Sequence, residues 1–133
     1  MQINIKTSGE NQAIVTQLTK KLTGGTKENV IARIALGYSL STGKRFTQQE
    51  FSAYDSQGKE YKDHILFDGQ YRDFYIALIC QAYGITKNDE LIPKYIKQHI
   101  DHGLEKINYL FENNPQYTFF DFLTEYFRKG IDM

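Results

Sequence analysis

The chain has 133 residues, 41% of them hydrophobic, and its 16 basic side chains are balanced by 16 acidic ones. This length suits one domain over residues 1–133 with a core of its own, and the single cysteine, Cys80, excludes an internal disulfide. We expect a cytoplasmic protein, because no apolar run approaches the roughly 20 residues of a membrane helix and the first residues lack a signal-peptide pattern.

The first predicted element is a short strand over residues 2–6. Apolar Ile3 and Ile5 alternate with polar residues, and a period of two is typical of a strand with one buried face. The polar residues of this strand are Gln2, Asn4 and Lys6. No second strand is evident in the chain, so we expect this strand to pair with its equivalent in another copy.

Two helices are predicted next, separated by the glycines at residues 24–25. Ser8 is a favourable N-cap for the first helix and Thr26 for the second, which ends at Gly43. The first helix carries an apolar stripe formed by Ile14, Leu18 and Leu22. The second has apolar residues at the i, i+3, i+4, i+7 spacing: Ile31, Ile34, Ala35 and Tyr38. Arg33 falls among them and needs an acidic or phosphate partner if it is buried.

Little regular structure is expected over residues 46–70, where turns are predicted at 54–58 and 67–69. Three further helices are predicted over residues 70–83, 88–111 and 119–128. The expected core face of the first of these comprises Tyr71, Phe74, Tyr75, Leu78, Ile79 and Ala82. The predicted fold is therefore mainly α: a short N-terminal strand and a helix pair similar to a ribbon-helix-helix unit, followed by about three further helices.

Charge is unevenly distributed along the chain. Residues 1–45 hold seven basic and two acidic side chains, a net charge of +5, and residues 46–133 hold nine basic and fourteen acidic ones, a net charge of −5. Such a chain is able to present one face to phosphates and another to a protein partner. The alternative is that the lysines only solvate a helix surface. The basic residues that flank the helix pair are Lys20, Lys21, Lys27, Lys44 and Arg45.

A strand followed by two helices is the order of a ribbon-helix-helix unit, in which the paired strands of two copies enter the major groove of DNA. The amides of Gln2 and Asn4 suit adenine edges, and Lys6 suits guanine or phosphate. The lysines around the helix pair attract phosphates without reading sequence, so contacts to the DNA backbone fit them best. The alternative for the strand is a polar surface that faces water. The predicted DNA-binding residues are Gln2, Asn4, Lys6, Lys20, Lys21, Lys27, Lys44 and Arg45.

No convincing catalytic set is found. His99 and His102 are spaced as half of a metal site, but no cysteine or third histidine lies at a suitable spacing. Cys80 lies in an apolar helix and is predicted to be a small buried hydrophobic side chain. We therefore predict a non-enzymatic chain without a metal or cofactor.

Several short motifs occur in a fixed order between Leu18 and Ile107. In the helix pair they are Leu22-Thr23-Gly24, Asn29, Arg33, Ala35, Ser39 and Leu40. After it come Tyr54-Asp55, Gly58, Glu60-Tyr61, Phe67-Asp68-Gly69, Tyr71, Tyr75, Ala77-Leu78, His99-Ile100 and Gly103-Leu104. In this order they resemble the DndE family, part of a bacterial system that replaces a non-bridging phosphate oxygen of DNA with sulphur. Residues 115–133 lie outside the resemblance.

The resemblance implies a non-catalytic subunit that associates with the other phosphorothioation proteins. It implies tetramers that bind duplex DNA, preferably nicked, through surface lysines, while a cysteine desulfurase and an iron–sulphur partner carry out the chemistry. The leading hypothesis is thus a DNA-binding accessory subunit of DNA phosphorothioation. The alternatives are a ribbon-helix-helix repressor or antitoxin, and a scaffold subunit that does not touch DNA.

Overall fold

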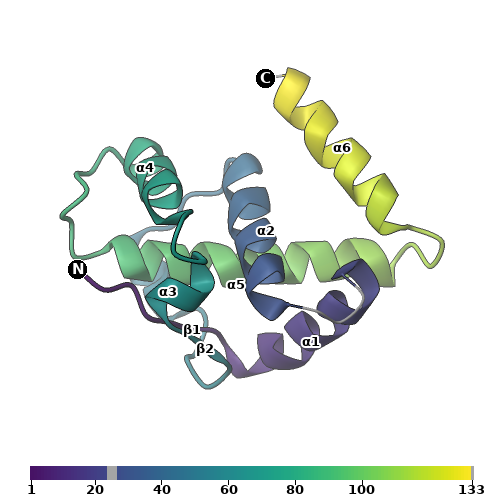
Figure 1. Ribbon diagram of the computed structural model, residues 1–133, viewed down its shortest axis with the longest axis horizontal. Helices are drawn as coiled ribbons and strands as arrows, with labels where there is room; N and C mark the ends of the chain where they lie inside the picture. Colours follow the sequence, from purple (N-terminus) through teal and green to yellow (C-terminus); the bar gives the residue numbers. More distant parts are fainter. Residues whose placement is uncertain (24–26, 133) are drawn as a thin grey trace.

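The computed structural model describes residues 1–23 and 27–132. Within these residues the chain forms six α-helices and one two-stranded antiparallel sheet (Figure 1), which confirms the predicted mainly α fold with a short N-terminal strand. In chain order the elements are β1 (Ile5–Lys6), α1 (Gly9–Thr23), α2 (Glu28–Ser41), the 3-10 helix η1 (Gln48–Ser52), β2 (Glu60–Tyr61), α3 (Asp63–Leu66), α4 (Arg72–Tyr83), α5 (Ile92–Glu112) and α6 (Phe119–Asp132).

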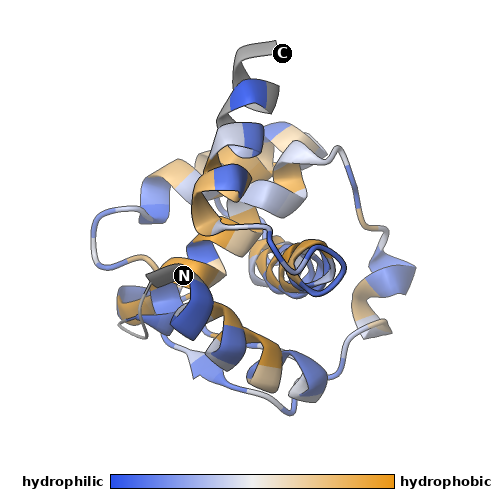
Figure 2. Cartoon of the chain, turned by 90° about the vertical axis from the view of Figure 1, so that its right-hand side faces the viewer, coloured by the Kyte–Doolittle hydropathy of each residue, from blue (hydrophilic) through white to orange (hydrophobic). Residues whose placement is uncertain are grey.

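Helix α5 lies at the centre of the fold, and α1, α2, α4 and β1 pack around it (Figure 2). Its apolar residues recur every three or four positions and are fully buried: Ile96, Ile100, Leu104 and Ile107. Helix α2 crosses α5 at very short range, because a Cβ added to Gly103 would lie 2.0 Å from the carbonyl oxygen of Ala35. Only a residue without a side chain permits this approach, so Gly103 determines how closely α2 lies on α5.

Strand β1 pairs with β2 of the same chain, so the expectation that it has no partner within its own chain is wrong. The pairing is antiparallel, with Lys6 opposite Glu60. Just before the strand, the N–H of Ile3 donates to a carboxylate oxygen of Asp63 at 2.8 Å. The sequence did not reveal β2, because a two-residue strand is too short to show an alternating pattern.

The two predicted helices after the strand are formed. The Ser8 hydroxyl accepts a hydrogen bond from the N–H of Asn11 at 3.3 Å, as expected of the residue that caps α1. The predicted glycine joint and the Thr26 cap lie outside the described residues. The N-cap position of α2 is occupied by Lys27, one residue later than the predicted cap.

Arg33 in α2 is half-buried. Its guanidinium donates to the carbonyl oxygen of Leu66 at 2.7 Å and lies 4.8 Å from the ring centroid of Tyr71. The expected acidic or phosphate partner applied to a buried Arg33, and this side chain is only half-buried. A carbonyl oxygen and an aromatic face provide alternative partners for a guanidinium.

The segment between α2 and α4 contains more structure than the predicted long loop. It forms η1, β2 and α3, each too short to show a clear period in the sequence. Both predicted turns are present. In the first, the Asp55 carboxylate accepts the N–H of Gln57 at 3.0 Å, and in the second Asp68 and Gly69 have positive φ angles of 52° and 68°.

Helix α4 forms where it was predicted and ends at Gly84, whose φ is 63°. The predicted core face is partly wrong. Ile76 and Ile79 face the core, whereas the side chain of Phe74 is 61% exposed. This helix is apolar on nearly all sides, so its periodicity does not indicate which side is buried.

Helices α5 and α6 begin close to their predicted starts. The Asp89 carboxylate accepts the N–H of Leu91 at 2.8 Å before α5. Thr118 caps α6, because its hydroxyl accepts the N–H of Asp121 at 3.1 Å and the Asp121 carboxylate accepts the N–H of Thr118 at 3.0 Å. Helix α6 continues beyond the expected end at Arg128. Among the described residues, every helix is too short or too polar to cross a bilayer.

Candidate nucleic-acid interface

The last turn of α1 carries Lys20 and Lys21, and both side chains are exposed. The only acidic residue of this helix is Glu10, in its first turn. An acidic residue at the start and cations at the end complement the helix dipole. Within the described parts of the chain, neither lysine forms an ion pair with a carboxylate. Both ammonium groups are therefore available to a phosphate.

Lys27 immediately precedes α2 and is also exposed. Its backbone is extended, with φ −148° and ψ 112°, and its side chain does not cap the first N–H groups of the helix. Amides at a helix start attract anions, because they point outward at the positive end of the dipole. Glu28 follows in the first turn, but its charge is balanced by an ion pair with Lys59. The predicted lysines thus occupy the end of one helix and the start of the next.

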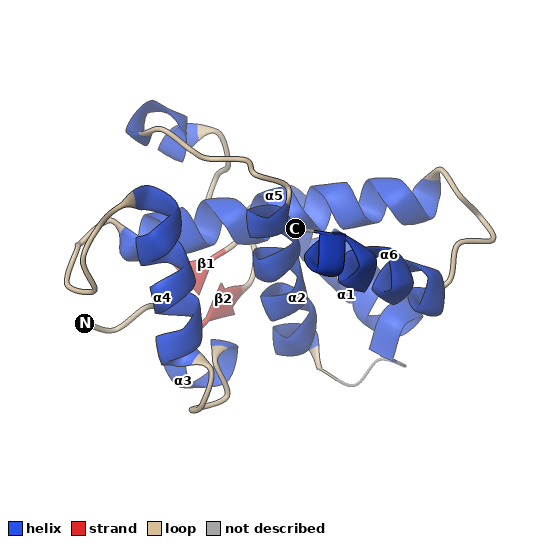
Figure 3. Ribbon diagram, turned by 90° about the horizontal axis from the view of Figure 1, so that it is seen from above, coloured by secondary structure: helices blue, strands red, loops and turns tan. Residues whose placement is uncertain are grey.

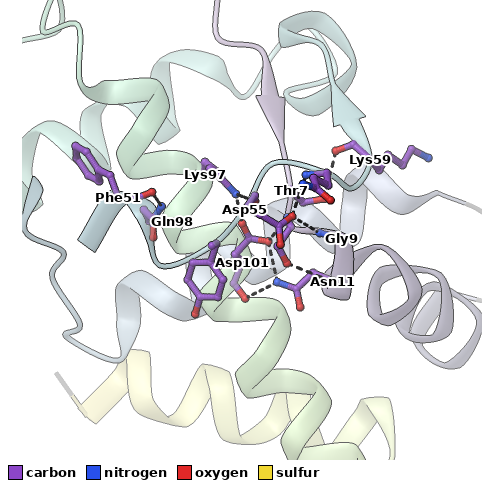
Figure 4. Close-up of polar contacts among 12 residues, drawn as sticks. Thr7, Gly9, Asn11, Phe51, Asp55, Lys59, Lys97, Gln98 and Asp101 are labelled. Carbon is purple, nitrogen blue, oxygen red and sulfur yellow. Dashed lines mark hydrogen bonds and ion pairs between the residues drawn. The ribbon is translucent and has the colours of Figure 1, made fainter. Parts of the chain in front are cut away.

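The buried carboxylate of Asp101 holds the lysine-bearing helix α1 to α5 (Figure 4). Its Oδ1 accepts the N–H of Ser8 at 3.0 Å and the side-chain amide of Asn11 at 2.7 Å. Its Oδ2 pairs with the ammonium group of Lys97 at 2.5 Å. Because three donors converge on one carboxylate, the start of α1 has a fixed position relative to α5.

The loop before β2 adds a second carboxylate to the start of α1. Asp55 Oδ1 accepts the N–H of Gly9 at 2.9 Å, and the carbonyl oxygen of Asp55 accepts a hydrogen bond from Lys97 at 2.8 Å (Figure 4). Hydrogen bonds from the amides of Gly9 and Gln57 hold the pKa of Asp55 below its usual value. The N–H of Gly9 has no partner inside the helix, so Asp55 supplies the acceptor that it lacks.

The predicted alternation in the N-terminal strand is confirmed. Ile3 and Ile5 are buried, whereas the polar residues between and beside them are exposed: Gln2, Asn4 and Lys6. The side-chain oxygen of Asn4 accepts the N–H of Asp63 at 3.2 Å, and Lys6 lies opposite Glu60. Asn4 and Lys6 therefore have neighbours within the chain.

Lys44 and Arg45 lie at the opposite end of α2 from Lys27, about 20 Å away for a helix of this length. Figure 1 shows the start of α2 near α1 and its end near α4. Lys44 pairs with Glu50 at 3.1 Å. The Arg45 guanidinium donates to the carbonyl oxygen of Lys44 at 2.8 Å and lies 5.9 Å from the ring centroid of Tyr83. The structure does not bring this pair of cations together with the lysines of α1.

The two histidines of α5 share one hydrogen-bond partner. The Nδ1 atoms of His99 and His102 both lie 2.7 Å from the hydroxyl oxygen of Ser39. His99 Nε2 lies 2.6 Å from the Tyr83 hydroxyl, which accepts the N–H of Phe46 at 2.9 Å. Two proton arrangements satisfy this network: Tyr83 donates to His99, His99 to Ser39 and Ser39 to His102, or each of these three donations runs in the opposite direction. Two neutral histidines satisfy the network, so the pair joins α2 to α5.

The burial of His99 predicts a loss of stability in weak acid. Burial, followed by the nearby charges of Arg45, His102 and Lys44, lowers the pKa of His99 to about 3. The unfolded chain takes up a proton near pH 6.5, but the folded chain does not. The stability that neutral His99 contributes is therefore fully present above pH 6.5 and is lost as the pH falls toward 3. Between pH 7.5 and 5, His99 alone is expected to lower the free energy of unfolding by about 2 kcal/mol, measured by urea unfolding.

A matched pair of variants isolates this contribution. His99→Gln keeps groups that meet Tyr83 and Ser39, and it is expected to flatten the pH dependence. His102, whose pKa burial also lowers, keeps its smaller contribution. The control is His64→Gln, which makes the same exchange at an exposed position outside this network. An unchanged slope in His99→Gln contradicts the prediction.

The chain was also compared with known proteins. A family model described as DNA sulphur modification protein DndE matches residues 4–114. The chain belongs to the DndE family. The matched stretch runs from the residue before β1 to just beyond α5, and α6 lies outside it. It confirms the resemblance given by the sequence motifs and extends it at both ends. None of the curated proteins compared with the chain matches it.

Four of the residues on which the resemblance to the DndE family rests stabilise the fold. The Tyr54 hydroxyl donates to Glu105 at 2.9 Å, and Asp55 holds the start of α1. His99 joins two helices, and Gly103 allows them to cross. These four motif residues therefore hold the fold together. The exposed lysines Lys20, Lys21 and Lys27 are not motif residues.

The roles of Asp101 and Lys59, which position the lysine-bearing helices, were not predicted from the sequence. Lys97 and Asp101 are spaced i, i+4 on a helix, which is a recognised signal of an ion pair. Lys59 gave no such signal, because its partner Glu28 lies 31 residues away in the chain.

Proposed function

We propose that this DndE-family chain is a DNA-binding accessory subunit of the DNA sulphur modification machinery. The observation that carries the proposal is the state of Lys20, Lys21 and Lys27. All three are exposed, lie at adjoining helix ends and have no carboxylate partner in residues 1–23 and 27–132. Lysines in this state hold the phosphates of DNA without reading its bases, so binding depends little on sequence.

The surroundings of these lysines support the same role. Helix α1, the two strands and the start of α2 lie on one side of α5 (Figures 1 and 2). Between its acidic first turn at Glu10 and its lysines, the exposed residues of α1 are uncharged: Gln12, Ala13, Thr16 and Gln17. A surface of cations and neutral polar groups suits a duplex backbone, because phosphate contacts come from both kinds of side chain.

The proposed role is non-catalytic, with the sulphur chemistry carried out by other proteins of the machinery that associate with this chain. The non-catalytic role is supported by the hydrogen bonds that His99, His102 and Asp101 form within the described residues. His99 and His102 are bound by Ser39, and Asp101 is bound by three donors from α1 and α5. These groups hold elements together, and the proposal requires no cofactor.

Charge reversal of the three lysines tests the proposal. The variant Lys20→Glu/Lys21→Glu/Lys27→Glu is expected to weaken binding to a fluorescent DNA duplex by more than about tenfold, measured by fluorescence anisotropy. With about three phosphate contacts, the wild-type affinity should fall by roughly 40-fold between 50 and 200 mM salt. Titrations with an intact duplex and with a nicked duplex of the same sequence compare the two forms of DNA.

A control variant separates this surface from a general effect of net charge. Lys87→Glu/Lys94→Glu/Lys106→Glu changes the net charge equally at exposed lysines elsewhere in the structure, and it is expected to bind almost normally. Equal losses in the two triple variants contradict the assigned surface. Absence of DNA binding by the wild-type chain at low salt contradicts DNA binding itself and favours a scaffold role.

A further inference from the structure

A small cavity lies where the end of α1, the end of α5 and the start of α6 meet. Figures 1 and 3 show these three segments at one end of the molecule, where the chain turns from α5 into α6. The volume of the cavity is about 360 Å³, which is within the range of pockets that hold small molecules. Six residues line it: Lys21, Phe111, Pro115, Tyr117, Thr118 and Phe119. The cavity therefore adjoins the end of α1, where the proposed phosphate contacts lie.

Aromatic rings form much of the wall of this cavity. Phe111 is only 7% exposed, and the ring of Tyr117 meets it edge-on, with the ring centroids 5.2 Å apart. The Tyr117 hydroxyl donates to a carboxylate oxygen of Glu125 at 2.6 Å, which holds this ring in position. Phe119 is half-buried and is the first residue of α6. The rings are thus held by contacts within the chain before any ligand arrives.

One cation lines the cavity beside these rings. Lys21 is exposed, and in the part of the chain that the structure describes it forms no ion pair with a carboxylate. The described residues that line the cavity include no acidic residue. The carboxylate of Asp121, in the first turn of α6, accepts the N–H of Thr118 at 3.0 Å and so remains at the helix start. The cavity therefore combines aromatic surface with an available positive charge.

A flat ring system that carries a negative charge fits this combination, and a nucleotide is such a group. Every nucleobase has a face that stacks on aromatic side chains, and the phosphate next to it suits a lysine. The base must be unpaired, because a base inside a duplex has neighbours on both faces and offers a protein only its edges. The class of ligand that matches the cavity is therefore DNA with an unpaired nucleotide.

We propose that the cavity holds an unpaired base of DNA, with the phosphate of that nucleotide at Lys21 and the adjoining duplex on Lys20 and Lys27. The inference rests on the proposed function and deepens it, because lysine contacts to phosphates do not by themselves distinguish paired from unpaired bases. Two of the three rings lie beyond residue 114, where the match to the DndE family model ends. Membership of the family therefore does not imply this site.

Two DNA duplexes test the proposal, identical except that one strand of the second carries a single extra thymine. That strand is continuous, so a preference for nicks does not enter. By fluorescence anisotropy the wild-type chain is expected to bind the bulged duplex about tenfold more tightly, because one base gains an aromatic partner. Phe119→Leu keeps an apolar side chain but removes the ring, so it should lose this preference and bind the paired duplex normally. Phe120→Leu is the matched control, since Phe120 is 77% exposed and does not line the cavity.

The outcomes separate this inference from the proposed function. Equal affinities for the two duplexes, or an unchanged preference in Phe119→Leu, overturn the cavity as a site for a base and leave the lysine surface as it is. Absence of binding to both duplexes overturns the proposed function and this inference with it.

A cross-linking experiment on the wild-type chain locates the base without any variant, so it also decides the case in which Phe119→Leu does not fold. Iodouracil replaces the extra thymine, and the complex is irradiated and digested. Mass spectrometry is expected to find the cross-link in the peptide that contains residues 115–119. A cross-link found only in other segments overturns the proposed site.

Discussion

Replacing Gly103 with alanine is expected to lower the free energy of unfolding by about 3 kcal/mol. The added Cβ would lie 2.0 Å from the carbonyl oxygen of Ala35, so α2 and α5 must move apart. Alanine favours a helix over glycine by about 1 kcal/mol, but this gain is smaller than the cost of separating two packed helices. Thermal unfolding should show a melting temperature lower by about 10 °C.

Gly37→Ala in α2 provides the matched control. A Cβ added there meets the hydroxyl oxygen of Tyr126 at 2.9 Å, which is the end of a flexible side chain and not backbone. We expect a change of less than about 1 kcal/mol, because the tyrosine side chain is able to move aside. Equal destabilisation by Gly37→Ala and Gly103→Ala contradicts the importance of the crossing between α2 and α5.

Replacing Asp101 with asparagine is expected to cost about 3 kcal/mol, although the side chain keeps its size. The carboxylate accepts hydrogen bonds at both oxygens, from Ser8 and Asn11 at one and from Lys97 at the other. The amide NH₂ of asparagine must face donors on one of these sides, and the charge of Lys97 loses its partner. Urea unfolding at neutral pH measures the loss.

A double-mutant cycle with Lys97→Met separates the ion pair from the hydrogen bonds to α1. If the pair contributes, the loss for the double variant is smaller than the sum of the two single losses. Glu112→Gln, at an exposed position of the same helix, is the control and should change stability by less than about 0.5 kcal/mol. If Asp101→Asn costs no more than this control, the assigned role of Asp101 is wrong.

The helices were predictable from the sequence because their signals are local. The apolar spacing of α5, the cap at Thr118 and the glycine after α4 each depend on residues within a few positions of one another. The alternation of Ile3 and Ile5 likewise indicated which side of the first strand is buried. Features of this kind survive folding because tertiary contacts reinforce them.

Features that depend on distant residues were not predictable in the same way. The pairing of β1 with β2 joins residues more than 50 positions apart, and the ion pair between Lys59 and Glu28 spans 31 positions. The buried side of α4 depends on which neighbour it meets, since its sequence is apolar all round. The candidate site also has local and long-range features. The lysines of α1 are neighbours in the sequence and were predicted as a cluster. The separation of Lys44 from them follows only from the direction of α2.

The central position of α5 has a consequence for biosynthesis. Helices α1, α2 and α4 and strand β1 all rest on α5, yet the ribosome makes residues 92–112 after every one of them. A nascent chain that ends before Ile92 therefore lacks the helix against which most of their apolar sides are buried. Productive folding must wait until α5 leaves the exit tunnel, and until then the emerging chain exposes segments that chaperones recognise.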